Sequence, residues 1–387
     1  FDFSFKLRQQ GYSLWRAAAY AHHERGTLVQ RGKSRDVLFE KHRAELYQRW
    51  QLETGLPESL WANALRPTEV WRDEALTLHT MHSVLLRAPL VSVMIPTFNR
   101  PELFIKTVQS ALQQTYPCVE IIVCDNSTND ETAHVIQPYL QDTRVRYIRN
   151  SEARSKAGNF LPFARLAQGE YLQWCMDDDI LLPQKLTKMM DVFLQHPEVV
   201  LVTSQRGIID AEGVFQGRFV DIPSLHGEYG LFSGTDIGRA ALLGHANFIG
   251  EPSAVLFRRK DLVHHYWRAE VRGYRVISDI VMWLELLEKG DCAIFTNPLS
   301  YYRRHGQQEG QQADVLLTSC IEWYRIMQEY YEKRMFLTTQ AEYREALLGL
   351  QQRCHDAMRP LLEQASASCV KTYRSVVREL DAFLAKD

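Results

Sequence analysis

The sequence predicts an α/β protein whose central sheet is mostly parallel, Rossmann-like and flanked by helices. Between Val91 and about His305, short apolar strands alternate with amphipathic helices, as in βαβ units. Residues 1–88 are rich in Arg, His, Trp and Glu, whereas residues 313–387 contain almost no Pro or Gly and place Leu and Tyr at helical spacing. We therefore expect a helical N-terminal segment at 1–88, an α/β domain at 89–312 and a C-terminal region of two or three helices at 313–387.

The strands of the α/β part end in polar residues. Strands are expected at 91–95, 119–124, 145–148 and 171–176, and helices from Pro101, from about Asp130 and across 159–167. Three of the strand ends carry Thr97 with Asn99, Asp125 with Ser127, and Asp177-Asp178-Asp179. Because ligands bind beyond the carboxyl ends of strands in open α/β sheets, these clusters predict a single crevice.

The Asp triplet is the most informative of the three clusters. Adjacent carboxylates repel one another and resist burial, so a strand that delivers them to its tip needs a compensating cation. Oxygen ligands of this kind suit Mg²⁺ or Mn²⁺, which usually arrive with the phosphates of a substrate. A solvated acidic turn is the alternative interpretation of an isolated triplet.

Composition excludes several classes of protein. A formal net charge of -2 and a pI near 6.7 argue against a broad nucleic-acid-binding face. The seven cysteines include no Cys-x-x-Cys pair, which is typical of reduced thiols rather than of disulfides or a zinc site. No apolar run is long enough to span a bilayer. We expect a cytoplasmic protein and leave peripheral contact with the inner face of the cell membrane open.

Three segments together resemble a known family. Val91–Arg100, Ile121–Ser127 and Gly169–Leu186 resemble, in order and spacing, the nucleotide-sugar-binding half of family 2 glycosyltransferases with the GT-A fold. The resemblance covers about Val91 to Gln311 and is weaker between Thr203 and Gly250. It implies a metal-dependent, inverting transfer of a sugar from a nucleoside diphosphate sugar, with a UDP-sugar favoured. The implied acceptor is a glycan or a lipid-linked glycan in bacterial surface polysaccharide synthesis.

The resemblance also assigns residues to the donor. It places Pro96, Thr97 and Asn99 at the nucleotide, together with Asp125 and Ser127. Asp125 would accept the N3–H of a uracil-like base, because an ionised carboxylate is a pure acceptor. A turn in which Asp125 binds its own backbone is the alternative. Arg154 and Lys156 would add positive charge at the diphosphate, although ordinary surface cations explain them equally well.

The metal site implied by the resemblance is the Asp triplet. The commoner family pattern is Asp-x-Asp-Asp, and Met176 stands where its first acid would be. This register makes Asp178 the direct ligand, with Asp177 near the ribose or the metal and Asp179 supporting the ligand or turned toward the sugar. His305 would complete the coordination of Mn²⁺ or Mg²⁺, and a surface role for that histidine is the alternative.

Asp279 is the predicted catalytic base. The segment Ser278–Leu287 resembles the helix that begins with the catalytic acid of the family, and Gly250–Arg258 resembles the strand beneath the acceptor. A general base takes the proton of the attacking hydroxyl, and one displacement inverts the anomeric carbon. A helix cap is the structural alternative for Asp279, and Glu251 is a weaker candidate for the base.

Further alternatives concern the ends of the chain and the class of function. Residues 1–12 resemble the helix after the catalytic acid of a preceding glycosyltransferase domain, as in a tandem enzyme; an ordinary helical extension is the alternative. The C-terminal aromatic stripe that includes Trp323 and Tyr330 is interpreted first as packing, then as a dimer or membrane contact. A non-catalytic glycan-binding or scaffold module would bind without transfer. The segment after Pro96 lacks the Gly-rich loop of nucleotidyltransferases, and no Gly-x-Gly-x-x-Gly of a dehydrogenase follows a strand.

Overall fold

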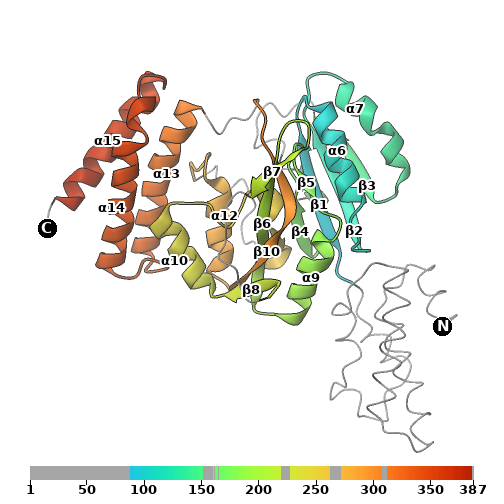
Figure 1. Cartoon of the computed structure of the whole chain (residues 1–387), viewed down its shortest axis with the longest axis horizontal. Coiled ribbons are helices and arrows are strands. Elements are labelled where there is room, and N and C mark those ends of the chain that lie inside the picture. The colour runs from blue at the N-terminus through green and yellow to red at the C-terminus, as the bar shows by residue number, and fades with distance from the viewer. Residues whose placement is uncertain are drawn as a thin grey trace, which may run out of the picture.

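A computed structural model describes residues 88–150, 160, 162–163, 165–218, 227–261, 272–306 and 312–385 (Figure 1). The expected N-terminal helical segment, its likeness to a preceding domain, and the candidate residues Arg154 and Lys156 lie outside these residues. The boundary between the α/β domain and the C-terminal region, placed at 312–313, remains our proposal.

Ten strands form one sheet in the described part of the chain. Its order is β3-β2-β1-β4-β9-β6-β10-β5, with β7 paired to β6 and β8 paired to β10. The strands are β1 (Val91–Thr97), β2 (Val119–Asp125), β3 (Val145–Arg149), β4 (Tyr171–Trp174), β5 (Ile180–Leu181), β6 (Val199–Ile209), β7 (Phe215–Arg218), β8 (Tyr229–Phe232), β9 (Leu256–Arg258) and β10 (Asp291–Arg303).

The parallel pairing expected from the sequence is found in the first half of the sheet. Strand β1 pairs in parallel with β2 and β4, and β2 pairs in parallel with β3. The sheet as a whole is mixed, because β9 enters antiparallel between β4 and β6, and β5, β7 and β8 also pair antiparallel. Since two successive antiparallel steps restore direction, β6 runs in the same direction as β4, and β10, which pairs in parallel with β6, does so too.

Helices flank this sheet. Proline at the first position and Glu102 in the first turn start α6 where the sequence predicts it. Side-chain caps of Thr339 and Ser366 start two of the C-terminal helices. The helices are α6 (Pro101–Leu112), α7 (Glu131–Ile136), α9 (Lys185–Gln195), α10 (Gly234–Gly244), α12 (Ser278–Leu287), α13 (Ala313–Glu332), α14 (Gln340–Asp356) and α15 (Ala367–Leu384), and the short 3₁₀ turns are η4 (Gln137–Gln141), η5 (Pro252–Ala254), η6 (Arg259–Asp261) and η8 (Arg359–Leu361).

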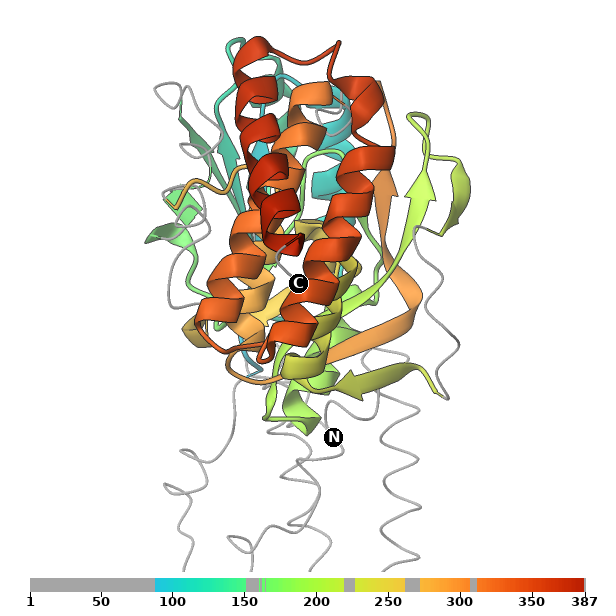
Figure 2. The same ribbon diagram turned by 90° about the vertical axis from the view of Figure 1, so that its left-hand side faces the viewer.

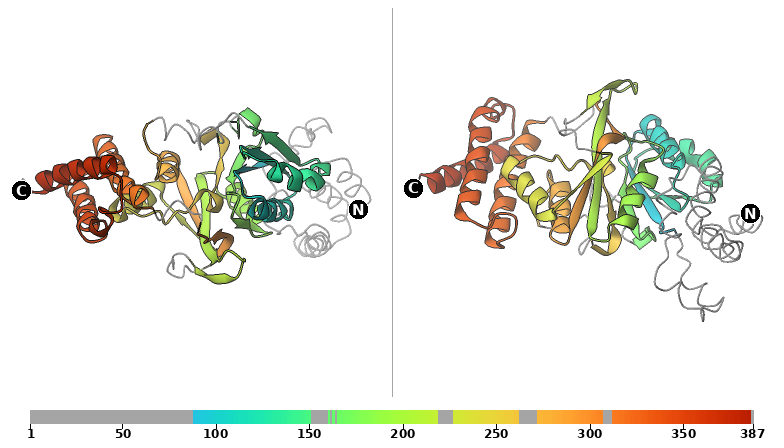
Figure 3. Two further views of the ribbon diagram at one scale, coloured as in Figure 1. Left: turned by 90° about the horizontal axis from the view of Figure 1, so that it is seen from above. Right: turned by 60° about the horizontal axis from the view of Figure 1, so that its bottom comes forward.

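Alternating side chains divide the core between the two faces of the sheet. On β1, Val93 and Ile95 pack into a cluster with α6 and α9, whereas Met94 belongs to a cluster with α10 and α12. The second cluster continues into α13, α14 and α15, which stand side by side at the end of the molecule opposite β3 (Figures 2 and 3). The C-terminal region therefore shares a hydrophobic core with the α/β part.

The C-terminal aromatic stripe is packing, as its first interpretation holds. Trp323, Met327 and Tyr330 on α13 are 3% exposed or less and belong to one hydrophobic cluster with residues of α10 and α12. All seven cysteines are free, and five of them are buried. The expectation of reduced thiols without a disulfide framework agrees with these positions.

Candidate active site

The carboxyl ends of β1, β2 and β4 meet at one edge of the sheet. Thr97 at the end of β1 lies in register with Asp125 at the end of β2. The chain that leaves β4 leads directly to the Asp triplet, and the Thr97 hydroxyl donates to Asp177 Oδ2 over 3.0 Å. The backbone N–H of Phe98 reaches the same oxygen over 3.3 Å. The first and third polar clusters predicted from the sequence are therefore in direct contact.

The three carboxylates of the triplet point in different directions. Asp177 is turned back toward the end of β1, and burial together with the negative charge of Asp178 raises its pKa to about 6, although Arg100 opposes this rise. Asp179 is 2% exposed and accepts from the backbone N–H of Arg303 over 3.2 Å. Burial, with Asp178 in addition, raises its pKa well above the ordinary range, and a hydrogen bond from Ser253 works against this. These two acids are thus held by the protein itself.

Asp178 is the member of the triplet that contacts both Arg100 and His305. Its Oδ2 lies 2.7 Å from Arg100 Nη1 and 3.0 Å from His305 Nε2. Arg100 also lies 3.4 Å from Asp177 Oδ1, so one guanidinium spans both acids. Asp178 and His305 were predicted to bind the same metal ion, and in the structure the two side chains are in direct contact.

The segment Tyr301–His305 does not simply follow a strand that ends at Phe295, as the sequence suggested. Strand β10 continues through Arg303, because Ser300 to Arg303 pair in parallel with Arg206 to Ile209 of β6 after an irregularity in register. This extension carries Arg303 into the site. Its side chain is 2% exposed, and Nε donates to the backbone oxygen of Asp178 over 2.9 Å. Nη1 donates to the carbonyls of Asp210 and Ala211, both over 3.0 Å, so Arg303 fixes the triplet to the end of β6.

The second polar cluster is tightly organised by its own hydrogen bonds. Asp125 is fully buried, with Oδ1 accepting from the Ser127 N–H over 2.7 Å and Oδ2 accepting from the Tyr147 hydroxyl over 2.6 Å. Arg149 Nη1 lies 3.7 Å from the same carboxylate. The local turn that the sequence offered as an alternative is therefore present. Contact of Asp125 with a nucleotide stays a prediction.

Asn99 joins the first two clusters. Its backbone N–H donates to Ser127 Oγ over 2.8 Å, and its side-chain oxygen accepts from the Thr128 N–H over 2.9 Å. Asn99 adopts a φ of 52°, in the left-handed region that Asn tolerates better than most residues. Pro96 is buried within β1. The loop after β1 is thus fastened to the loop after β2.

Asp279 lies in the first turn of α12 and is half-buried. Its Oδ1 accepts from the backbone N–H of Ile280 over 2.8 Å, and its Oδ2 accepts from Asn247 Nδ2 over 2.6 Å. Asn247 is itself fixed by Gly250, whose N–H donates to Asn247 Oδ1 over 2.8 Å. The bond from the Ile280 N–H agrees in part with the alternative that Asp279 caps the helix. The second oxygen is oriented by Asn247, which was not predicted from the sequence.

A short loop connects Asp279 to the Asp triplet. Gly250 leads into Glu251 and η5, where the Ser253 hydroxyl accepts from the Met176 N–H over 2.9 Å. Glu251 forms an ion pair with the buried Arg206, with Nε and Oε2 3.0 Å apart. Burial raises the pKa of Tyr302 to about 12, and Glu251 adds to this rise. The segment of Asn247 to Ser253 thus lies between the predicted base and the predicted metal ligands.

Lys185 is a further residue whose role sequence reasoning did not give. It is fully buried, and its ammonium donates to the Ala254 carbonyl over 2.7 Å. Burial lowers its pKa to about 7, against the opposing charges of Cys175 and Asp179. Lys185 lies in the segment Gly169–Leu186 that resembles the family. Its position at the start of an apolar helix face was the only hint in the sequence that it is buried.

The side chains at the strand ends offer two donors to a divalent ion. Among the residues that the structure describes, no three His, Cys, Asp or Glu side chains form a group that could hold a metal. Asp178 Oδ2 and His305 Nε2 nevertheless converge within 3.0 Å, and carboxylate oxygen with neutral imidazole is a suitable donor pair for Mn²⁺. A nucleotide-linked ion takes its remaining ligands from phosphates and water. The residues present therefore fit such an ion as a two-donor platform.

Comparisons with known proteins identify the family. Residues 92–263 match the model described as Glycosyl transferase family 2. The UDP-Glc:alpha-D-GlcNAc-diphosphoundecaprenol beta-1,3-glucosyltransferase WfaP of Escherichia coli is 30% identical over 219 residues, which are 56% of this chain and 78% of that protein. The chain belongs to glycosyl transferase family 2. It is therefore a transferase, as its motifs predict.

One further relative and one solved structure show how far the similarity extends along the chain. Protein CgeD of Bacillus subtilis (strain 168) is 26% identical over 212 residues, which are 51% of this chain and 46% of CgeD. The crystal structure of S. aureus TarS 1-349 in complex with UDP matches with a TM-score of 0.52 and 12% identity, covering 76% of this chain and 83% of that chain. The expected GT-A fold is confirmed. Among the described residues, no helix has the length and apolar character to cross a bilayer.

Proposed function

We propose that this family 2 glycosyltransferase moves a sugar from a UDP-sugar to a glycan or lipid-linked glycan, with a divalent metal ion and with inversion. The observation that carries the proposal is the convergence of Asp178, Arg100 and His305 at the carboxyl ends of β1, β4 and β10. A carboxylate and an imidazole beside a guanidinium provide both ligands for a metal ion and a donor for phosphate oxygens.

The donor is proposed from the cluster at β1 and β2 and from the relatives. Thr97, Asn99, Asp125 and Ser127 gather beside the triplet, where a nucleoside would adjoin its diphosphate. The name of WfaP specifies UDP-Glc, and the TarS structure was obtained with UDP. The WfaP name also specifies a diphosphoundecaprenol-linked acceptor. A lipid-linked glycan in surface polysaccharide synthesis is therefore the acceptor that we favour.

Members of the family generally use a divalent metal ion, which when bound supplies positive charge for the departing diphosphate. Asp178 and His305 are the residues that would hold it. Arg100, which already spans Asp177 and Asp178, contributes a fixed guanidinium for phosphate oxygens. Arg303 and Thr107 hold the backbone of the triplet in place through the carbonyls of Asp178 and Asp179.

Asp279 is the proposed general base. Its Oδ2 is oriented by Asn247, and its position in the first turn of α12 places it at the positive end of a helix dipole, which favours negative charge. An ionised carboxylate accepts the proton of the acceptor hydroxyl as that oxygen attacks the anomeric carbon. A single displacement of this kind inverts the configuration and needs no covalent intermediate.

A donor screen tests the proposal. The chain is incubated with a panel of sugar nucleotides, with and without Mn²⁺, and release of the nucleoside diphosphate is followed. UDP-sugars should respond, chelation should abolish the response, and Asp178→Ala should abolish it while Asp236→Ala, an exposed acid on α10, should not. A non-catalytic glycan-binding module would release nothing from any donor, and Asp178→Ala would then change only stability.

A further inference from the structure

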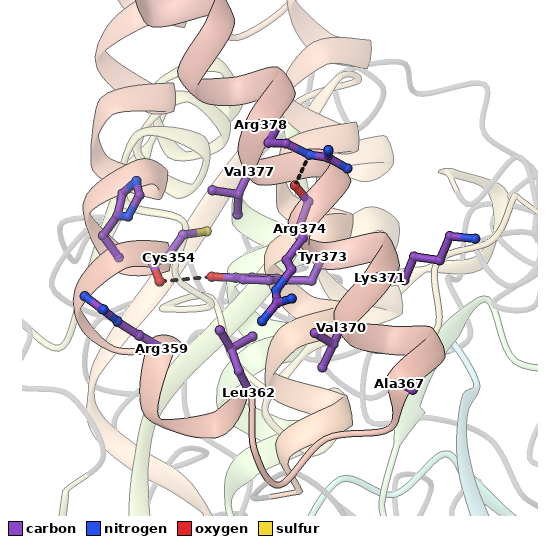
Figure 4. A pocket seen from close by; sticks show the side chains of 11 residues that line it. Cys354, Arg359, Leu362, Ala367, Val370, Lys371, Tyr373, Arg374, Val377 and Arg378 are labelled. Carbon is purple, nitrogen blue, oxygen red and sulfur yellow. Dashed lines mark hydrogen bonds between the residues drawn. The ribbon is translucent and has the colours of Figure 1, made fainter.

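A groove lies between the end of α14 and α15 (Figure 4), and these helices stand at the C-terminal end of the molecule, away from β1 and β2 (Figure 1). Its volume is about 760 Å³, within the range of small-molecule sites. The walls come from the last turn of α14, from η8 and the chain after it, and from α15. Nothing in the proposed transfer reaction uses this groove.

The groove has an apolar floor. Leu362, Val370 and Val377 are half-buried against the core, and the ring of Tyr373 is 4% exposed. The Tyr373 hydroxyl donates to the Cys354 carbonyl over 2.9 Å, which satisfies the polar end of that ring (Figure 4). The floor therefore offers hydrocarbon surface without a free polar group of Tyr373.

The rim of the groove is cationic. No Asp or Glu lines it, and the four strong cations of the rim have no carboxylate within 4.0 Å among the residues that the structure describes, while His355 pairs with Asp381 at 3.3 Å. Figure 4 shows Leu362 between Arg359 and Arg374. The four cations are Arg359, Lys371, Arg374 and Arg378.

The sequence of α15 produces this arrangement. Val370, Tyr373 and Val377 recur at helical spacing on one stripe, and Lys371, Arg374 and Arg378 form a second stripe beside it. Like charges three or four residues apart weaken a helix. Among the described residues no carboxylate offsets this repulsion, although the formal net charge of the chain is -2, and the cations stand beside partly exposed apolar surface. Binding of an anionic ligand explains both stripes together.

We propose that this groove binds an anionic lipid, with the phosphate head on the arginines and the hydrocarbon chain along Leu362, Val370 and Val377. A soluble anion would use the rim and leave the floor exposed, whereas a neutral lipid would use the floor and leave the four cations without a negatively charged partner. An anionic amphiphile matches both surfaces. The site would tether the enzyme to a membrane surface and does not depend on the assignment of the transfer reaction.

Binding to vesicles tests this site in the full chain. Sedimentation with phosphatidylcholine vesicles is compared with vesicles that also contain phosphatidylglycerol, at low and at physiological salt. The chain should bind the anionic vesicles, less so at higher salt. Arg374→Glu with Arg378→Glu should lower this binding at least about tenfold, since each basic side chain near the surface adds measurably to it. The matched control, Lys106→Glu with Lys260→Glu, makes the same charge change at exposed positions outside the groove and should bind like the parent.

A second variant separates a lipid from a free phosphate. Val377→Asn keeps every charge, so it should weaken binding to anionic vesicles several-fold while leaving any binding of inorganic phosphate unchanged. Circular dichroism confirms that each variant is folded. Equal binding to both vesicle types, or charge-reversed variants that bind like the parent, would overturn the proposal. A dimer that dissociates in these variants without vesicle binding would assign the groove to a second copy and also overturn it. UDP release from the donor should persist in every groove variant.

Discussion

Asp279→Asn separates the proposed base from its structural role. Asp279 Oδ2 accepts from Asn247 Nδ2 over 2.6 Å, and Oδ1 accepts from the Ile280 N–H over 2.8 Å. Asparagine has one acceptor oxygen, so it satisfies one of these donors and turns its own amino group toward the other. Asn247 cannot rotate to help, because its oxygen accepts from the Gly250 N–H and its amino group also donates to the Gly250 carbonyl.

The expected cost in stability follows from that conflict. One part-buried donor loses its partner, which lowers the free energy of unfolding by about 1–3 kcal/mol. Loss of a general base lowers turnover by about 10²–10⁴-fold, while the donor KM stays near that of the parent. Thermal unfolding measures the first quantity, and release of UDP in the presence of acceptor measures the second.

Asn247→Ala is the matched control for this variant. It breaks the same bond to Asp279 and also the bonds to Gly250, so it should destabilise the chain at least as much, while the carboxylate of Asp279 remains. Its turnover should therefore fall far less than that of Asp279→Asn. If the two variants lose turnover equally, or if Asp279→Asn retains turnover within about threefold, Asp279 is a structural residue and Glu251→Gln becomes the variant to measure.

Three further outcomes are expected. Asp178→Asn removes a negative charge that adds to the effect of burial in raising the pKa of Asp177 and Asp179, and it also removes the ion pair to Arg100, so these changes in stability oppose each other; Mn²⁺-dependent release of UDP should be lost, and an unchanged Mn²⁺ response would contradict the metal assignment. Arg303→Lys removes the guanidinium that donates to three backbone carbonyls, so the free energy of unfolding measured in urea should fall by about 2–4 kcal/mol. A loss below about 0.5 kcal/mol would show that these bonds do not stabilise the site. Gly238→Ala on α10 places a Cβ 2.5 Å from the Phe336 ring and should destabilise by about 1–3 kcal/mol, whereas Gly244→Ala, whose Cβ meets nothing nearer than 4.0 Å, should be neutral or stabilising in the same urea titration.

Local patterns were sufficient for the first half of the fold. The apolar runs of β1, β2 and β4 are flanked by Pro, Gly and Asp, and α6 begins at Pro101 as predicted. The residues at these strand ends were found because a parallel arrangement places successive carboxyl ends at one edge. The three C-terminal helices also follow from periodicity alone, since little in that stretch interrupts them.

The features that could not be predicted from the sequence depend on pairing between residues far apart in the chain. The extension of β10 through Arg303 depends on its register with β6, almost 100 residues earlier, and periodicity within Tyr301–Arg303 does not encode it. The antiparallel insertion of β9 between β4 and β6 is likewise a property of the assembled sheet. Asn247 was missed for the same reason: its importance lies in two contacts, to Gly250 and to Asp279, of which one spans 32 residues.

Burial distinguishes the three acids of the triplet, whose separate roles the sequence leaves ambiguous. Three adjacent carboxylates imply a cation, yet the protein supplies the Arg100 guanidinium beside both Asp177 and Asp178, so the triplet alone does not require a metal. What distinguishes the three acids is accessibility: the Asp178 side chain is 13% exposed, that of Asp177 4%, and Asp179 2%. An acid that keeps contact with solvent can exchange a side-chain cation for another one at little desolvation cost, whereas its neighbours would first have to be unburied. Asp178 is therefore the acid through which a metal-bound diphosphate would engage this site.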